Sequence, residues 1–119
     1  MKYAVLLVLF CSLVSWSESK PETFTGEIAD SSCAYNVHSL SRSHKEMLKS
    51  KAWGKTPADC TRRCVRKFGA SYVLVNGNDV YHLEQQNMAD PYAGQKVKII
   101  GTLSEQEQTI HIDKIGLLK

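Results

Sequence analysis

Short segments of β-forming residues fill the second half of the chain, and their alternation is compatible with few folds. Residues 71–75 (SYVLV) and 80–84 (VYHLE) flank Asn-Gly-Asn-Asp, a sequence typical of a tight hairpin turn. Residues 96–103 (KVKIIGTL) and 109–118 (TIHIDKIGLL) form a second pair across a polar loop. Residues 23–29 (TFTGEIA) alternate in the same way nearer the N-terminus. The sequence therefore predicts five strands.

Five short strands are best accommodated by closing the sheet, because closure removes unpaired sheet edges. We therefore expect an OB-like five-stranded small barrel, a mainly β domain of the α+β class. An open five-stranded sheet with helices on one face is the alternative. The predicted core is apolar and comes from all five strands: Phe24, Ile28, Tyr72, Leu74, Val80, Leu83, Val97, Ile99, Leu103, Ile110, Ile112 and Ile115.

Two short helices are predicted between the first and second strands. Residues 43–46 (SHKE) have the form of a capping box, in which Ser and Glu satisfy the first backbone amides of a helix over 43–53. Thr followed by Pro at 56–57 is typical of a second helix start, and this helix is expected over 57–68. Together they form a helical insertion at about residues 37–69.

The N-terminus has the features of a cleavable signal peptide. Lys2 precedes an apolar run over residues 3–14, too short to span a bilayer comfortably, and small residues follow it. We therefore expect residues 1–19 to be removed on export to the periplasm or the extracellular space, leaving a domain over 23–118. No later apolar run is long enough to cross a membrane, so no transmembrane segment is expected after cleavage.

Several strand segments carry motifs that can be compared with known proteins: YVLV at 72–75, VYxL at 80–83, AGQKVKIxGTL at 93–103 and IxIxxI at 110–115. These motifs resemble small exported bacterial OB-fold proteins. Two further motifs, Asp-Ser-x-Cys…His at 30–38 and Cys-Thr-x-x-Cys-Val at 60–65, resemble an uncharacterised exported bacterial protein family. The resemblance runs from about residue 24 to 115, and it implies an OB-like fold and export rather than a particular chemistry.

Three of the four cysteines remain after signal cleavage, and their spacing suits a shared ligand. Cys60 and Cys64 lie four residues apart on a predicted helix, so both sulfurs project from one face. The candidate metal ligands are Cys33, His38, Cys60 and Cys64, with His44 and Met47 as additional ligands. Three cysteines and a histidine suit Zn²⁺, whereas added soft or imidazole ligands favour Cu. Bound Zn or Cu is therefore the predicted cofactor.

A disulfide is the alternative use of these cysteines. On an undistorted helix the Cβ atoms of Cys60 and Cys64 would be about 5–6 Å apart, which is too far for a disulfide between them. Cys33 would therefore pair with Cys60 or Cys64, closing a loop of about 30 residues and stabilising the fold by about 3 kcal/mol. An odd number of cysteines leaves at least one thiol without an intrachain partner.

Basic residues concentrate in the helical insertion. Residues 42–67 contain nine lysines and arginines against two acidic residues, in a chain whose net charge is only +3. The predicted basic surface consists of Lys45, Lys49, Arg62, Arg63, Arg66 and Lys67. Such a surface could hold an anionic polymer or a protein, or it could consist simply of two solvated helix faces. Nucleic acid is not expected as a partner of an exported protein.

These patterns predict an exported small binding module with a Cys/His metal site. The alternative is a disulfide-stapled interaction domain that binds an anionic polymer or a protein. Neither is an enzyme, because the Cys-x₃-Cys spacing is neither the Cys-x₂-Cys redox motif nor a haem attachment site. The sequence also has no glycine-rich phosphate-binding loop. The two strand histidines, His82 and His111, are expected on exposed faces.

Overall fold

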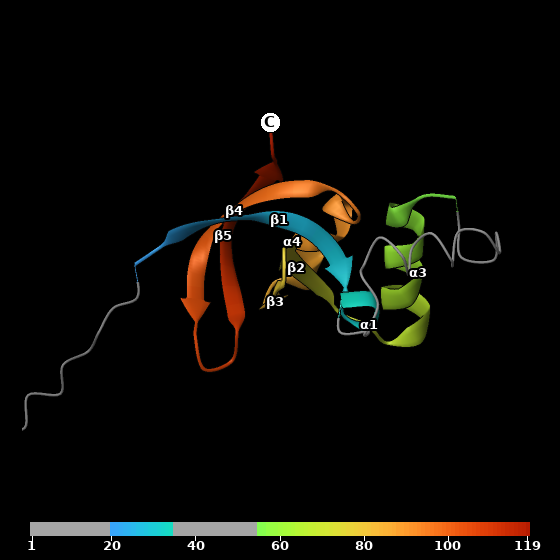
Figure 1. The fold of residues 1–119 in the computed structure, drawn as a ribbon, viewed down its shortest axis with the longest axis horizontal. Helices are drawn as coiled ribbons and strands as arrows, with labels where there is room; N and C mark the ends of the chain where they lie inside the picture. The colour runs from blue at the N-terminus through green and yellow to red at the C-terminus, as the bar shows by residue number, and fades with distance from the viewer. Residues whose placement is uncertain (1–19, 35–54) are drawn as a thin grey trace, which may run out of the picture.

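The computed structural model describes residues 20–34 and 55–119, and five strands dominate this part of the chain (Figure 1). The strands are β1 (Glu22–Asp30), β2 (Tyr72–Asn76), β3 (Asp79–Leu83), β4 (Lys96–Ser104) and β5 (Thr109–Leu117). The helices are α1 (Ser31–Ala34), α3 (Pro57–Phe68), α4 (Gln86–Ala89) and the 3₁₀ turn η1 (Asp90–Tyr92). The predicted mainly β class with short helices is confirmed, and the predicted helix over 43–53 lies outside the described residues.

The strands close into a ring in the order β1-β2-β3-β5-β4, which returns to β1. Neighbours are antiparallel except β3 and β5, which pair in parallel. β1 closes the ring because its first part pairs with β4 and its last part with β2, where Ile28 lies opposite Leu74. The open sheet considered as the alternative therefore does not form. The hairpin turn predicted between β2 and β3 is present, with Gly77 at a φ of +59°.

The core lies inside this ring, where alternate residues of each strand meet. Every predicted core residue is buried there or packs against it, except Val80. That prediction was wrong because Val80 lies three residues from Leu83, which is buried inside the ring. Residues two apart on a strand share a face, so Val80 and Leu83 lie on opposite faces. Tyr81 therefore takes the inward position, and its ring centroid lies 5.9 Å from that of Phe24.

The segment between β3 and β4 contains α4 and η1, which were not predicted from the sequence. The side chain of Gln86 accepts a hydrogen bond from Tyr72 N at 2.7 Å and donates to Leu83 O at 2.8 Å. It thereby joins the ends of β2 and β3 to α4. Ala89 and Ala93 are fully buried and belong to the core. This segment therefore covers one end of the ring, and its small apolar residues make that contact close.

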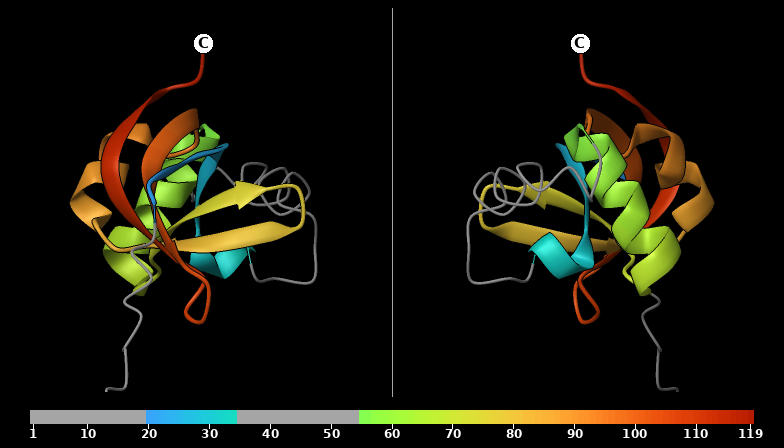
Figure 2. Two further views of the ribbon diagram at one scale, coloured as in Figure 1. Left: turned by 90° about the vertical axis from the view of Figure 1, so that its left-hand side faces the viewer. Right: turned by 90° about the vertical axis from the view of Figure 1, so that its right-hand side faces the viewer.

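α3 lies outside the ring, next to α1 and the end of β1, as the two side views show (Figure 2). Its bounds are those predicted. Thr56 caps the first turn by accepting a hydrogen bond from Asp59 N at 3.2 Å, and Gly69 ends the helix in the left-handed conformation. Ala29 and Val73 are opposite each other on β1 and β2 and are fully buried, although they alternate with core residues. Both faces of the sheet are therefore covered at these two residues. α3 and α1 meet over the outer face, which forms a buried region separate from the core inside the ring.

Candidate metal centre

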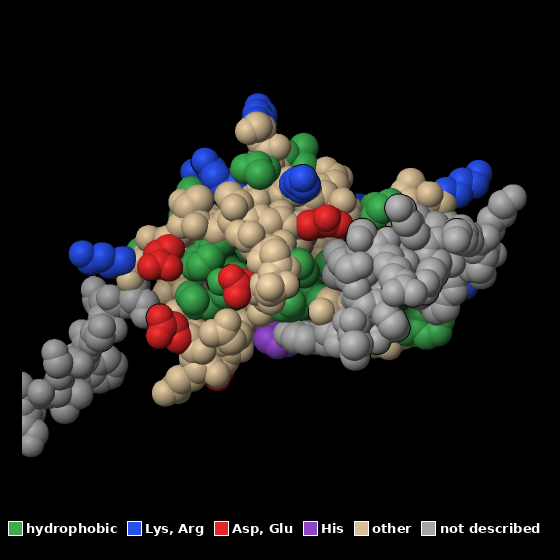
Figure 3. Space-filling view, viewed as in Figure 1, with side chains coloured by type: hydrophobic (Ala, Val, Ile, Leu, Met, Phe, Trp, Pro, Cys, Tyr) green, Lys and Arg blue, Asp and Glu red, His purple; other side chains and the backbone are tan. Residues whose placement is uncertain are grey.

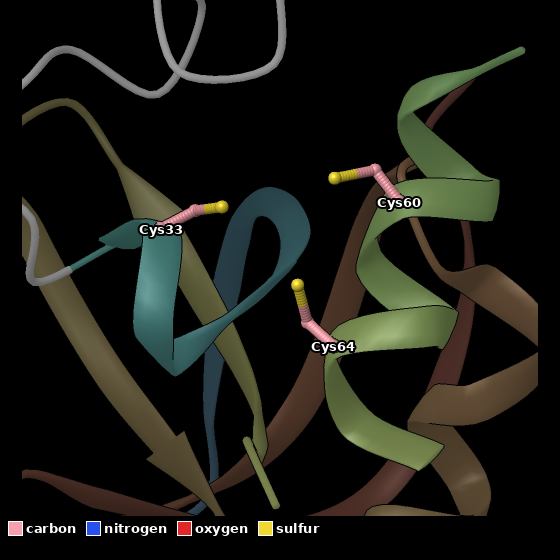
Figure 4. A group of neighbouring side chains, drawn as sticks. All are labelled: Cys33, Cys60 and Cys64. Atoms are coloured by element: carbon pink, nitrogen blue, oxygen red, sulfur yellow. The ribbon is translucent and has the colours of Figure 1, made fainter. Parts of the chain in front are cut away.

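Three cysteine sulfurs from two separate elements meet between α1 and α3. Cys33 projects from α1, whereas Cys60 and Cys64 project from successive turns of α3, and the three side chains point toward one another (Figure 4). Their Sγ atoms all lie within 4.8 Å of one another, and all three residues are buried. The predicted convergence of these cysteines is therefore present in the structure.

The position of Cys33 follows from the way β1 ends. Asp30 is the last residue of β1, and its Oδ2 accepts a hydrogen bond from the backbone N–H of Cys33 at 3.0 Å, as a helix-capping residue does. The same turn is fixed to the start of β2, because Ser31 N donates to Ser71 O at 2.8 Å and Ser71 N donates to Ser31 Oγ at 3.0 Å. Cys33 therefore sits on a short turn that is anchored on both sides.

On the other side, arginines hold α3 against the turn η1. Arg62 donates to the backbone oxygens of Asp90 and Pro91 at 3.3 Å, and Arg66 forms an ion pair with the Asp90 carboxylate at 3.0 Å. Asp90 also accepts a hydrogen bond from the buried hydroxyl of Tyr72 on β2. These contacts determine how α3 is rotated, so that the face carrying Cys60 and Cys64 points toward α1.

The surroundings of the thiols favour their protonated form. Burial raises the pKa of Cys64 to about 12 and also raises the pKa of Cys33 and Cys60. The negative charge of Asp30 raises the pKa of all three further. A metal ion binds thiolates, so it must displace the thiol protons and supply the positive charge that this region lacks.

Two buried polar atoms beside the cysteines have no hydrogen-bond partner. These are Oδ1 of Asp30, three residues before Cys33, and Oγ1 of Thr61, next to Cys60 on α3; both residues are fully buried. An unsatisfied buried polar group costs about 1–3 kcal/mol, and a charged one costs more. Neither residue was predicted as part of the site. The sequence signal that could have identified Asp30 is the Asp-Ser-x-Cys motif. It places a carboxylate three residues before a candidate ligand, which is the spacing of a helix N-cap from the backbone N–H that it binds.

The dimensions of the group suit a small soft metal ion. With metal–sulfur bonds of about 2.3 Å, sulfurs in a tetrahedral site lie about 3.8 Å apart. Sulfurs already within 4.8 Å of one another would need to close by no more than about 1 Å. Such a shift is within reach of side-chain rotation. Three thiolates are ligands for Zn²⁺ and Cu⁺.

The other predicted ligands, His38, His44 and Met47, lie outside the described residues. The predicted disulfide from Cys33 to Cys60 or Cys64 is not formed in the structure. The two strand histidines are exposed, as expected. His111 lies beside Glu84, at 3.0 Å from its carboxylate, and forms no part of the cysteine group.

Two residues of the predicted basic surface have a structural role. Arg62 and Arg66 bind the segment at Asp90, and Arg63, Arg66 and Lys67 are all exposed. Lys45 and Lys49 lie outside the described residues. On the face seen in Figure 3, lysine and arginine side chains are scattered around the edge and do not gather over one element. The described residues of this face therefore carry no concentrated basic patch.

Comparison with protein-family models, with curated proteins and with solved structures finds no match to this chain. Within residues 20–34 and 55–119, no helix has the length and apolar character needed to cross a membrane. The function must therefore be argued from the cysteine group and its surroundings.

Proposed function

We propose that this chain is an exported, non-catalytic binding module in which Cys33, Cys60 and Cys64 hold a soft metal ion, Zn or Cu. One observation carries the proposal: three buried sulfurs from two elements far apart in the sequence lie within 4.8 Å of one another. Adjacent buried polar atoms without partners support it, because a bound ion gives them a compensating charge. His38 is proposed as a further ligand on the sequence pattern alone.

We also propose that the ring of strands is an OB-like barrel. An OB fold is a five-stranded Greek-key barrel, and the strand order β1-β2-β3-β5-β4 fits that description. The metal centre would then lie at one end of β1, between this barrel and the helical insertion. Export through the signal peptide at residues 1–19, and kinship with the uncharacterised exported bacterial family, belong to the same proposal.

The alternative, a disulfide-stapled domain that binds an anionic polymer or a protein, has less support. Its disulfide is not formed in the structure, and Arg62 and Arg66 of its basic surface are already bound to Asp90. Heparin retention at low salt that falls steeply as salt rises would be the result that favours it.

The test is metal analysis of protein recovered, without a histidine tag, from cells expressing the full sequence. We expect about one Zn or Cu per chain by native mass spectrometry, lost on treatment with a strong chelator. Cys64→Ser should abolish binding, whereas Ser32→Ala, an exposed change beside Cys33, should leave it intact. A wild-type chain that takes up neither ion, even after reduction and metal addition, would contradict the proposal.

A further inference from the structure

Asp30 is a buried carboxylate whose second oxygen has no assigned role. The side chain is 0% exposed, and Oδ2 is used to cap α1 at Cys33. Oδ1 has no hydrogen-bond partner. No lysine, arginine or histidine among residues 20–34 and 55–119 forms an ion pair with it.

Capping alone does not explain an aspartate at this position. Asn, Ser and Thr cap helices about as well as Asp and carry no charge. Burying a carboxylate without a cation is strongly unfavourable, because the charge loses its hydration. A neutral residue would therefore cap α1 at lower cost, unless the charge has a partner that the protein part of the structure does not provide.

The location of the charge indicates what that partner is. Asp30 lies beside the thiols, because its Oδ2 accepts a hydrogen bond from Cys33 N at 3.0 Å and its negative charge raises the pKa of all three cysteines. A charge that only stood beside three metal-bound thiolates would repel them and weaken metal binding. The same charge becomes favourable when its oxygen contacts the metal ion.

We infer that Oδ1 of Asp30 is the fourth ligand of the three-cysteine site and that it makes the site select Zn²⁺ over Cu⁺. The inference rests on the proposed function, names the ion that it left open, and assigns the fourth position to Asp30 in place of His38. Zn²⁺ takes four ligands in a tetrahedron and accepts a carboxylate oxygen at about 2.0–2.2 Å. Cu⁺ is satisfied by soft sulfur ligands and has less use for a carboxylate. With Cu⁺ the buried carboxylate would stay unpaired beside an anionic centre.

Asp30→Asn tests this because the amide oxygen can still cap α1 at Cys33, which leaves the amide N–H₂ facing the sulfurs. An N–H donor stabilises thiolates but cannot ligate a metal. In chelator competition with each ion, we expect Asp30→Asn to lower Zn²⁺ affinity at least about tenfold. Cu⁺ affinity should be equal or higher. The matched variant Ser32→Ala, an exposed change beside Cys33, should leave both affinities unchanged.

Each alternative outcome has a distinct meaning. Unchanged Zn²⁺ affinity in Asp30→Asn, or an equal loss for both ions, would overturn the role of Asp30 while the metal site stands. A wild type that binds neither ion would overturn the proposed function as well.

A second readout uses Co²⁺ in place of Zn²⁺ and does not depend on affinity. The thiolate-to-cobalt charge-transfer bands should keep their intensity in Asp30→Asn, because three thiolates remain. The d–d bands should shift, because the fourth ligand changes. Unshifted d–d bands would contradict ligation by Asp30. Circular dichroism of the metal-free variant checks that it folds, and Asp30→Ser, which also keeps a capping oxygen, replaces Asp30→Asn if it does not.

Discussion

At the scale of single residues, Gly94 shows how closely the helical insertion packs on the ring. Its φ is +74°, which side chains other than glycine's rarely adopt. A Cβ at this position would lie 2.6 Å from the backbone nitrogen of Ala58, in the first turn of α3. Gly94 N also donates to Ile28 O at 2.7 Å, so this residue lies between β1 and α3. A side chain here has no room unless the backbone moves.

We therefore expect Gly94→Ala to destabilise the protein by about 1–3 kcal/mol, from the unfavourable φ and the backbone clash together. Metal affinity should fall as well, because displacing α3 moves two of the three sulfurs. Gly116→Ala is the matched control, since a Cβ there meets no atom within 4 Å and its φ is not positive. Urea unfolding of both variants measures the difference, and equal midpoints would refute this account of Gly94.

Some residues of the site could be predicted from the sequence, and others could not. Cys60 and Cys64 were predicted to share a face because helix periodicity is local, and Cys33 was linked to them only by being the remaining cysteine. Asp30 was not predicted as part of the site. Its role depends on full burial where β1 meets α3 and β2, which begin 27 and 42 residues after Asp30, and no local pattern reports that burial.

At the scale of elements, boundaries set by local chemistry were predictable and those set by tertiary contacts were not. α3 begins at Pro57 and ends at Phe68 as predicted, because its caps lie in the adjacent sequence. α4 was missed because Gln86–Ala89 is only one turn long and is held by Gln86 contacts to β2 and β3. A single helical turn has too few residues to show a hydrophobic period.

α3 also offers a test of capping. Thr56→Ala removes the oxygen that accepts from Asp59 N, so the apo protein should lose about 1 kcal/mol of stability. Thr56→Ser retains the oxygen and should recover most of that loss. The measurement is chemical unfolding of both variants in the presence of chelator. An alanine variant as stable as the serine variant would show that this cap contributes nothing to α3.

The contact between β2 and η1 predicts a specific pH dependence. The hydrogen bond from Tyr72 lowers the pKa of Asp90, whose contribution is therefore full above about pH 4 and lost as pH falls through the folded-state value. Burial raises the pKa of Tyr72 to about 12, so its contribution is full below about pH 10 and lost between there and about pH 12. The bond should therefore stabilise the fold only between these limits.

Tyr72→Phe should thus cost about 1–2 kcal/mol at neutral pH, with the deficit shrinking below pH 4 and above pH 10. Urea unfolding across this range measures it. Tyr81→Phe, at the half-buried tyrosine of β3, is the control and should give no such profile. A deficit in Tyr72→Phe that is constant with pH would mean that the hydroxyl acts through packing rather than through Asp90.

At the scale of the whole molecule, the ring and the metal centre are distinct parts with different sources of stability. The ring is held by a continuous apolar core and by strand pairing on both sides of every strand. α3 is held by arginine contacts to Asp90 and by packing against the buried cysteines. An element attached in this way is expected to open locally more often than the strands do.

Metal binding should remove that difference, because a metal ion at the three sulfurs joins α3 to the turn that follows β1. In the presence of chelator, amide hydrogens of α3 should exchange faster than those of β4 in a hydrogen-exchange experiment. Adding Zn²⁺ should raise the protection of α3 toward that of β4, since opening α3 then requires breaking metal–sulfur bonds. Cys33→Ser keeps α3 intact but removes its link to α1, so Zn²⁺ should have little effect on α3 in that variant. If α3 is already as protected as β4 without metal, its position is determined by its contacts with the ring alone. Metal binding would then contribute nothing to holding α3 in place.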